Sequence, residues 1–259
     1  MLGRRQFINA VAASGVIATL LSAGNVAAQT GDAYQTNHGT LTIYPVSHGS
    51  FVMETPSGAI YVDPVGTPEQ FAALPPPALV LITHEHGDRY NAETLLALIG
   101  ERETRIIVTP TVYRRMPAEL RVRATAMANG QSALFGAITI DAIPAYNLSE
   151  ARQRYHPMGR GNGYVLNVDG VKVYIAGDTE DTPEMRALTG IGIAFLPVDP
   201  LYTMSLAQAA DAIAEFMPAI VYPYAYRDAD HPDADPRPLA VLVAERGVRT
   251  QVKFGAWYP

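Results

Sequence analysis

The sequence predicts an α/β protein in which two mixed β-sheets pack face to face with helices on the outside. Two blocks of short apolar strands follow residue 28, and each block leads into strands that alternate with helices. The 259 residues, 48% of them hydrophobic, are enough for one domain with a large core. Because no change of composition marks a linker, we expect a single domain over residues 29–259.

The expected strands are short apolar runs separated by turn residues such as Pro56-Ser57-Gly58. In the first half, the expected strands are residues 41–44, 51–54, 59–62, 78–82, 105–109, 122–127, 132–135 and 137–143, and the expected helices are 68–74 and 91–99. In the second half, the expected strands are residues 163–168, 171–176, 193–197, 220–222 and 249–253, and the expected helices are 183–188, 205–217 and 236–246.

The N-terminal segment has the pattern of a twin-arginine export signal. Arg4-Arg5 precedes an apolar run over residues 8–21, and Val26-Ala27-Ala28 offers small residues for cleavage before Gln29. The alternative is a retained membrane anchor, but the run is rich in Ala and Gly and short for a membrane span. We therefore expect removal of residues 1–28, a periplasmic or secreted mature protein, and no stable insertion into the membrane.

The composition excludes several kinds of site. There is no cysteine, so disulfides and thiolate ligands are excluded, and any metal must be held by nitrogen and oxygen. The mature chain has 17 basic and 25 acidic residues and no run of Lys or Arg. Nucleic-acid binding requires a basic face, so we expect a small-molecule substrate and no nucleic acid. The sequence does not indicate an oligomeric state.

The most informative motif is Thr83-His84-Glu85-His86-Gly87-Asp88, which directly follows the apolar strand over residues 78–82. The loop after a buried parallel strand is where α/β proteins place their chemistry. Imidazole and carboxylate are zinc ligands, and one strand end can bring His84, His86 and Asp88 to one point. The two histidines could also lie in a polar surface turn, but the aspartate and the preceding strand favour a metal site.

Three further residues stand where expected strands begin or end. His156 lies in a glycine-rich loop before an apolar strand, and the spacing of those glycines is not that of a phosphate-binding loop. Asp178 closes the strand over residues 171–176; it could simply cap a turn, but a carboxylate at a buried strand end is costly unless a cation pairs with it. Asp63 is expected to accept a hydrogen bond that fixes the tautomer of a ligand histidine.

These motifs resemble the metallo-β-lactamase superfamily, and most closely its branch of ascorbate-phosphate lactonase-like metal-dependent hydrolases. The resemblance covers nearly all of the mature chain and implies an αββα sandwich with one or two zinc ions at the sheet edges. It rests on Thr83-His84-Glu85-His86-Gly87-Asp88, Ala145-Tyr146-Asn147, His156-Pro157, Gly177-Asp178-Thr179 and Tyr222-Pro223-Tyr224. It implies that His84, His86 and His156 bind the first metal. Asp88 and Asp178 would bind the second, with Asp178 able to bridge the two.

The chain departs from the family pattern at Arg89 and Ala225, where the family usually has histidine. Arginine has no lone pair to donate, and alanine offers no ligand at all. A guanidinium near Asp88 and Asp178 could neutralise the carboxylates that a second zinc would otherwise hold. We therefore expect one tightly bound zinc ion, with two as the alternative.

The expected activity is hydrolysis of a small ester, lactone, amide or phosphoester by a zinc-bound hydroxide. Asp88 would orient the water and later return a proton to the leaving group. The residues expected to stabilise an oxyanion or bind a substrate carboxylate are Arg89, Arg160, Asn162 and Tyr226. Weaker candidates for a further ligand are the loop histidines His48 and His231. Iron, manganese or nickel could take the place of zinc. The alternative function is a non-catalytic protein of the same fold that binds or senses a ligand.

Overall fold

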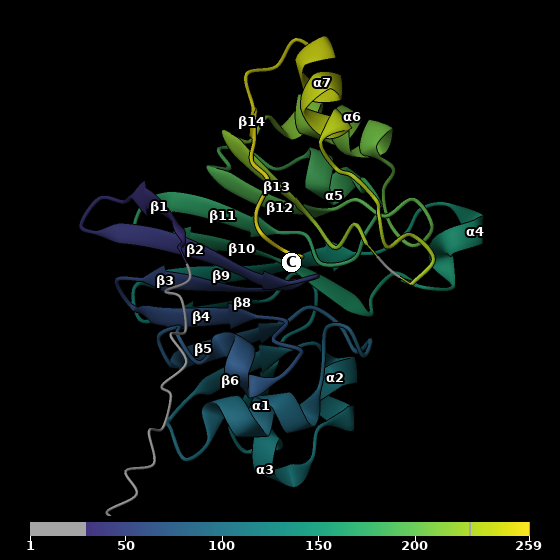
Figure 1. Ribbon diagram of the computed structural model, residues 1–259. Helices are drawn as coiled ribbons and strands as arrows, with labels where there is room; N and C mark the ends of the chain where they lie inside the picture. Colours follow the sequence, from purple (N-terminus) through teal and green to yellow (C-terminus); the bar gives the residue numbers. More distant parts are fainter. Residues whose placement is uncertain (1–29, 228, 259) are drawn as a thin grey trace, which may run out of the picture.

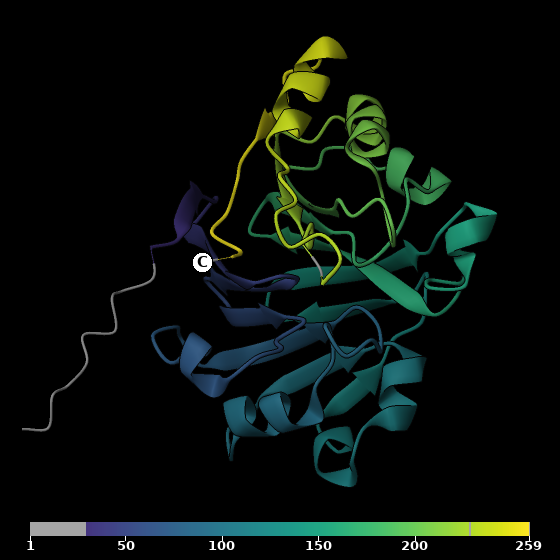
Figure 2. The same cartoon turned by 45° about the vertical axis from the view of Figure 1, so that its right-hand side comes forward.

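The computed structural model describes residues 30–227 and 229–258, so the expected export signal over residues 1–28 lies outside the described residues. Two seven-stranded mixed sheets pack against each other between two groups of helices (Figures 1 and 2). The expected αββα sandwich is therefore confirmed. In the described part of the chain, no helix has the length and apolar character needed to cross a membrane.

The two sheets are built in the same order. The first sheet contains β1 (Asp32–Gln35), β2 (Thr40–Ser47), β3 (Ser50–Thr55), β4 (Gly58–Val62), β5 (Pro77–Ile82), β6 (Arg105–Val108) and β7 (Ala124–Ala126). The second contains β8 (Ser132–Phe135), β9 (Ile138–Ala145), β10 (Gly161–Val168), β11 (Val171–Ile175), β12 (Ile193–Pro197), β13 (Ile220–Tyr224) and β14 (Gln251–Val252). Neighbouring strands are antiparallel from β1 to β4 and from β8 to β11, and parallel in the rest of each sheet.

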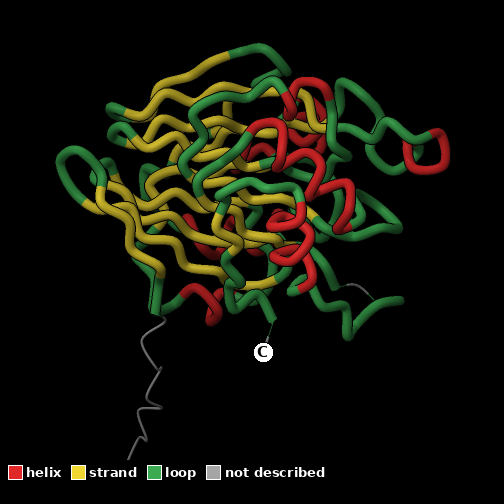
Figure 3. The backbone as a smooth tube through the Cα atoms, turned by 90° about the horizontal axis from the view of Figure 1, so that it is seen from above, coloured by secondary structure: helices red, strands yellow, loops and turns green. Residues whose placement is uncertain are grey.

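Helices cover the outer faces of both sheets (Figures 1 and 2). The first sheet is covered by the 3-10 helix η1 (Pro68–Phe71) and by α1 (Ala92–Ile99), α2 (Pro110–Arg115) and α3 (Ala118–Arg121). The second is covered by α5 (Pro183–Arg186), α6 (Leu206–Phe216) and α7 (Pro238–Glu245). The short helix α4 (Glu150–Gln153) projects beyond the sheets at the end of a loop (Figure 3).

The core between the sheets is apolar and rich in aromatic rings. Phe51 of β3 stacks on Phe195 of β12 with ring centroids 4.1 Å apart, and Trp257 meets the edge of Phe51 at 5.8 Å. Trp257, which follows β14, is almost completely buried and is part of the core. Buried aromatic rings contribute much of the hydrophobic stabilisation of a domain.

This architecture places several loops at one end of the two sheets. The parallel strands β4, β5, β11, β12 and β13 all end there, and the turn between β2 and β3 lies beside them. In parallel sheets the carboxyl ends of the strands meet at one edge, which is where ligand sites form. Residues far apart in the sequence can therefore converge at this edge.

Candidate metal centre and pocket

Four expected ligands form one cluster at the sheet edge. Each of His84, His86, His156 and Asp178 offers one ligand atom, and these four atoms lie within 4.8 Å of one another. His84 Nε2 lies 3.1 Å from His86 Nδ1, and Asp178 Oδ2 lies 3.5 Å from Nε2 of both His84 and His156. Around a tetrahedral zinc ion with bonds of about 2.0–2.1 Å, ligand atoms are roughly 3.3–3.4 Å apart. These three separations therefore match those around one zinc-sized ion.

The electronic state of the histidines also suits a metal. Burial lowers the pKa of His84 to about 3, although the Asp178 carboxylate acts in the opposite direction, so the ring is neutral. His156 Nδ1 lies 3.2 Å from the carbonyl oxygen of Tyr202, which can only accept a hydrogen bond. Asn147 Nδ2 lies 3.1 Å from the same ring nitrogen, but it donates to the carbonyl oxygens of Arg152 and Tyr202, so Nδ1 carries the ring proton. His156 Nε2 is buried without a hydrogen bond in the described structure and faces the Asp178 carboxylate. A lone pair that faces a carboxylate needs a cation or a proton between them.

A hydrogen-bond chain behind the cluster orients His84. Thr83 donates to the Asp63 carboxylate twice, from its backbone nitrogen at 2.7 Å and from Oγ1 at 2.6 Å. Because the hydroxyl proton points to Asp63, Oγ1 accepts a hydrogen bond from His84 Nδ1 at 3.0 Å. The ring proton is thereby kept on Nδ1, and the lone pair of Nε2 faces the cluster. Asp63 therefore acts on the tautomer through Thr83 instead of contacting the ring. Burial raises the pKa of Asp63 to about 7, while Arg89 and Thr83 lower it.

Arg89 lies beside the cluster and is almost completely buried. Its Nη2 donates to Asp178 Oδ1 at 2.6 Å, its Nη1 lies 3.1 Å from Asp88 Oδ2, and its Nε lies 3.8 Å from Asp63 Oδ2. Burial alone would raise the pKa of Asp178, but Arg89 holds it well below its usual range. Gly49 leaves the space that the Arg89 guanidinium occupies, because a Cβ on residue 49 would lie 2.2 Å from Arg89 Nη1. Three carboxylates thus surround one guanidinium.

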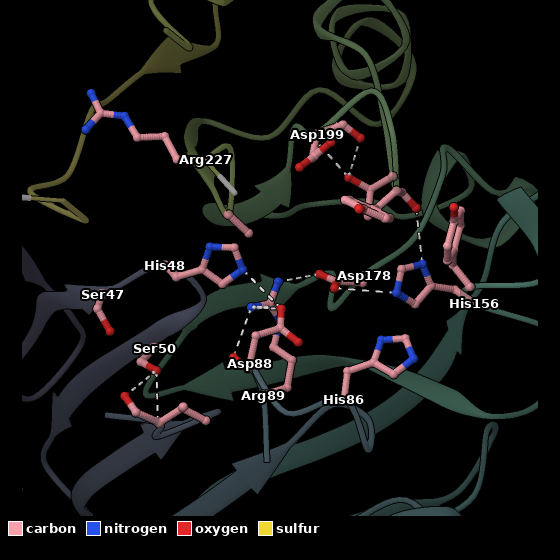
Figure 4. A pocket seen from close by; sticks show the side chains of 15 residues that line it. Ser47, His48, Ser50, His86, Asp88, Arg89, His156, Asp178, Asp199 and Arg227 are labelled. Carbon is pink, nitrogen blue, oxygen red and sulfur yellow. Dashed lines mark hydrogen bonds and ion pairs between the residues drawn. The ribbon is translucent and has the colours of Figure 1, made fainter. Parts of the chain in front are cut away.

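Asp88 is not one of the four clustered ligands, although it lines the same pocket (Figure 4). Its Oδ2 lies 3.1 Å from His48 Nε2 and 3.1 Å from Arg89 Nη1, and its side chain is 45% exposed. His48 is held from the other side by Tyr258, whose hydroxyl lies 3.0 Å from Nδ1. Burial alone would raise the pKa of Asp88, but Arg89 and His48 hold it well below its usual range. Asp88 is therefore a carboxylate on the pocket wall that is paired with Arg89 and His48, and it lies outside the ligand cluster in the structure.

A pocket of about 470 Å³ opens over the cluster and is lined by His86, His156 and Asp178. Most of the other residues that line the pocket are not predicted from the sequence, among them Ser47, Tyr155, Asp199, Tyr202 and Arg227. Asp199 follows the end of β12, just as Asp178 follows β11, so the same strand-end signal could have identified it. The two tyrosines lie in irregular loops and carry no comparable signal.

Of the four residues expected to contact substrate, the pocket contains Arg89 alone within the described structure. Arg160 pairs with the buried carboxylate of Glu85. Asn162 is buried and donates to the carbonyl oxygen of Met127, just after β7, at 2.7 Å, and it does not line the pocket. Tyr226 packs against Tyr258, with ring centroids 4.8 Å apart. The expected further ligand His231 is exposed and does not line the pocket.

Known proteins share this fold. Residues 42–225 match the family described as the beta-lactamase superfamily domain. A UPF0173 metal-dependent hydrolase of Thermococcus onnurineus is 30% identical over 200 residues, which cover 73% of this chain and 87% of that protein. A related protein of Archaeoglobus fulgidus is 25% identical and covers 80% of this chain and 92% of its own length.

A solved structure from Parabacteroides distasonis, described as a candidate metal-dependent hydrolase, is 36% identical with a TM-score of 0.78. The match covers 88% of this chain and 99% of that one. The family match over most of the chain, the similar hydrolases and the ligand cluster all indicate the same protein family. The chain belongs to the beta-lactamase superfamily and, within it, to the UPF0173 metal-dependent hydrolases.

Proposed function

We propose that this protein is an exported hydrolase that uses a single zinc ion to cleave a small ester, lactone, amide or phosphoester. One observation carries the proposal: His84, His86, His156 and Asp178 lie close enough together to hold one metal ion, while a guanidinium lies directly beside them. We also propose that the protein belongs to the lactonase-like branch, which its sequence motifs resemble most closely. The negatively charged chain supports a small-molecule substrate and not a nucleic acid.

Zinc is the proposed metal because three imidazoles and one carboxylate, without thiolates, are ligands that it accepts well. When bound there, a zinc ion would polarise the substrate carbonyl or phosphoryl group and lower the pKa of a water to about 7. A catalytic site needs a position that protein ligands leave open. Three histidines and one oxygen of Asp178 would already complete a tetrahedral site, so a water would have to enter as a fifth ligand. Arg89 would help to leave room for it, because it occupies the other oxygen of Asp178.

Arg89 is the proposed reason for a single metal. Its charge sits between Asp178 and Asp88, the two carboxylates that a second ion would use. A buried guanidinium cannot lose its proton at any ordinary pH, so it supplies this charge permanently. A second divalent ion would have to displace it or lie close to it at a large electrostatic cost.

Asp88 is the proposed residue that orients the attacking water. Its carboxylate is open to the pocket, and Arg89 and His48 fix its direction. A carboxylate placed in this way can accept a hydrogen bond from a water in the pocket. We therefore propose that Asp88 orients this water and later returns a proton to the leaving group.

Export is proposed from the sequence of residues 1–28, which lie outside the described structure. The twin-arginine route carries proteins that are already folded, which would allow metal loading in the cytoplasm. Cell fractionation of the full chain and of an Arg4→Lys, Arg5→Lys variant tests this step. Retention of the variant in the cytoplasm supports export by this route, and unchanged fractionation contradicts it.

The test of the central proposal is elemental analysis of protein purified without added metal or chelator, joined to an assay with an aryl ester. We expect about one zinc per chain and hydrolysis that disappears in the His84→Ala, His86→Ala double variant. His38→Ala, which changes a histidine between β1 and β2, should keep both the zinc and the activity. Two zinc ions per chain would contradict the single-metal proposal. No bound metal after reconstitution would favour the non-catalytic alternative.

A further inference from the structure

The third histidine of the metal cluster lies in a different kind of segment from the other ligands. His84 and His86 follow β5, and Asp178 follows β11, whereas His156 lies in the long connection between β9 and β10, after the short helix α4. This connection projects beyond the two sheets (Figures 1 and 3). The strands alone therefore do not determine where His156 lies, and other contacts must hold it against Asp178.

Glu180, two residues after Asp178, holds the first part of this connection. Its side chain is about 1% exposed. Oε2 accepts hydrogen bonds from the backbone nitrogens of Leu148 and Ser149, both at 2.6 Å, and Oε1 accepts one from the Ser149 hydroxyl at 2.6 Å. A buried carboxylate is costly unless donors or a cation compensate it. The connection between β9 and β10 supplies these donors, so it is fastened to the chain just after Asp178.

Arg152 of α4 adds a cation to the same carboxylate. Its Nη1 lies 3.0 Å from Glu180 Oε1 and also donates to the carbonyl oxygen of Thr203, in the loop between β12 and α6. Its own carbonyl oxygen accepts a hydrogen bond from Asn147 Nδ2 at 2.9 Å. Charge-assisted hydrogen bonds of this kind are stronger than neutral ones. The helix α4 is thereby held by Glu180 on one side and by the loop after β12 on the other.

Asn147 links these contacts to His156. Its backbone nitrogen donates to the carbonyl oxygen of His156 at 2.8 Å, which closes the connection into a loop. Its Nδ2 donates to the carbonyl oxygen of Tyr202 at 2.8 Å, the oxygen that also lies 3.2 Å from His156 Nδ1. Because Asn147 directly precedes Leu148, a single residue separates the contact at Glu180 from the contact at His156.

Asp178 and Glu180 therefore have different tasks, although only one residue lies between them. The Asp178 carboxylate faces the metal cluster, with Oδ2 3.5 Å from His156 Nε2. The Glu180 carboxylate faces backbone nitrogens, and in the described structure it neither lines the pocket nor belongs to the four-ligand cluster. Any influence of Glu180 on the metal site must therefore pass through the loop that carries His156.

From these contacts we propose that Glu180 is a positioning residue that places His156 as the third histidine ligand of the metal. It acts through the backbone of Leu148 and Ser149 and through Asn147, and it touches neither the metal nor the substrate. Residues behind a ligand histidine commonly determine how well that histidine binds. This inference rests on the metal site of the proposed function and not on the reaction that the site performs.

The test compares the zinc affinity of Glu180→Gln with that of the wild type, measured on the full chain by competition with a chelator. The amide oxygen can replace Oε2, but the amide nitrogen then faces the guanidinium of Arg152, and two donors cannot pair. We expect α4 to be released on this side and the zinc affinity to fall roughly 10- to 100-fold. An unchanged zinc affinity would overturn the proposal.

A double-mutant cycle separates positioning of His156 from a general loosening of the fold. In a His156→Ala background, Glu180→Gln should change the zinc affinity by less than about twofold, because the ligand that it positions is absent. In a His86→Ala background, Glu180→Gln should keep its full effect. Equal losses of zinc affinity in the two backgrounds would overturn the proposal, since a loosened fold would weaken every ligand alike.

Asp181→Asn is the matched control, because it changes the next carboxylate in the chain, which pairs with Arg186 and not with the loop. Its zinc affinity should equal that of the wild type. If Glu180→Gln does not fold, Ser149→Ala takes its place, since it removes a single donor from the Glu180 carboxylate. Ser149→Ala should weaken zinc binding when His156 is present and not in the His156→Ala background. The same loss in both backgrounds, or no loss in either, would overturn the proposal.

The same variants distinguish failure of this inference from failure of the hydrolase function. If the wild type does not hydrolyse the aryl ester but its zinc affinity depends on Glu180 through His156, the hydrolase function fails and the inference is supported. If Glu180→Gln binds zinc as the wild type does, and hydrolysis still requires His84 and His86, the inference fails and the hydrolase function is supported. A wild-type protein that binds no zinc would overturn both.

Discussion

Arg89 Nη2 donates to Asp178 Oδ1 at 2.6 Å, while the other oxygen of the same carboxylate faces the imidazoles of His84 and His156 at 3.5 Å. One carboxylate therefore connects an internal cation to the metal-ligand cluster. The guanidinium fixes the rotation of the carboxylate and leaves one oxygen for a metal. The same contact neutralises charge that a second metal would otherwise balance.

The first prediction concerns the charge of Arg89. Arg89→Met should lower the free energy of unfolding of the metal-free protein by about 3–5 kcal/mol, because Asp178, Asp88 and Asp63 lose their buried cation. Urea unfolding monitored by circular dichroism measures this change. Added zinc should stabilise the variant more than the wild type, since a divalent ion can replace the missing charge.

Arg186→Met is the matched control for Arg89→Met. Arg186 also pairs with two carboxylates, Asp181 and Glu215, but its side chain is 28% exposed. Ion pairs in contact with water contribute about 0–1 kcal/mol, so this variant should lose little stability. Similar losses in the two variants would show that the buried cation has no special role.

The second prediction concerns the space that Gly49 leaves for Arg89. Gly49→Ala should cost about 1–3 kcal/mol of unfolding free energy, because the new Cβ would lie 2.2 Å from Nη1 of a guanidinium that its ion pairs hold in place. In the Arg89→Met background the same substitution should cost much less. A double-mutant cycle by urea unfolding measures this coupling.

Gly87→Ala provides the control, because a Cβ at Gly87 would meet nothing within 4 Å. This substitution in the same histidine motif should change the stability little in either background. If Gly49→Ala costs as much without Arg89 as with it, the close approach of the two residues is not the cause.

The sequence predicted most of the sheets because their strands are apolar runs. The strand β1 was missed, since its residues Asp32–Gln35 alternate between exposed and half-buried positions and include little apolar character. The helices α2 and α3 were missed because they are short, with only one buried residue each. Pro110 in the first turn of α2 was the available signal for that helix.

The site was predictable only in part, for a physical reason. His84, His86, His156 and Asp178 follow or precede strands whose order places their ends together, so local sequence was sufficient to propose them. The direction of Asp88 depends on His48, which is 40 residues away, and His48 in turn contacts Tyr258. Asn162 was expected to bind substrate but is buried and does not line the pocket. Contacts of this kind arise from tertiary packing and leave no periodic pattern in the sequence.

The third prediction is a pH dependence outside the metal centre. Hydrogen bonds from the His38 side chain, Thr36 and the His38 backbone lower the pKa of Asp169 to about 2. Because this pKa is below the unfolded value of 3.8, the stabilisation is present above pH 4 and is lost as the pH falls toward 2. Asp169→Asn should therefore lower the urea midpoint at pH 7 and have a smaller effect at pH 3.

Asparagine suits the backbone at this position, since Asp169 has a φ of 48° and asparagine tolerates the left-handed region. The comparison therefore isolates the charge from backbone strain. A difference in midpoint that stays constant from pH 7 to pH 3 would contradict the assigned cause.

The fourth prediction concerns the hydrogen-bond chain from Asp63 through Thr83 to His84. In Asp63→Asn, the amide oxygen can still accept from the Thr83 backbone, but the amide nitrogen must donate to Thr83 Oγ1. The hydroxyl would then donate to His84 Nδ1, which moves the ring proton to Nε2, the atom that faces the cluster. Zinc affinity, measured by competition with a chelator, should fall roughly 10- to 100-fold.

Nitrogen NMR of the metal-free protein can test this mechanism separately from affinity, because the two tautomers of His84 give different ring-nitrogen shifts. The wild type should carry the proton on Nδ1 and Asp63→Asn on Nε2. Asp169→Asn makes the same chemical change on the protein surface and should alter neither the tautomer nor the zinc affinity. A weaker zinc site with an unchanged tautomer would assign the loss to charge, whereas a changed tautomer shows that Asp63 acts by directing the Thr83 hydroxyl.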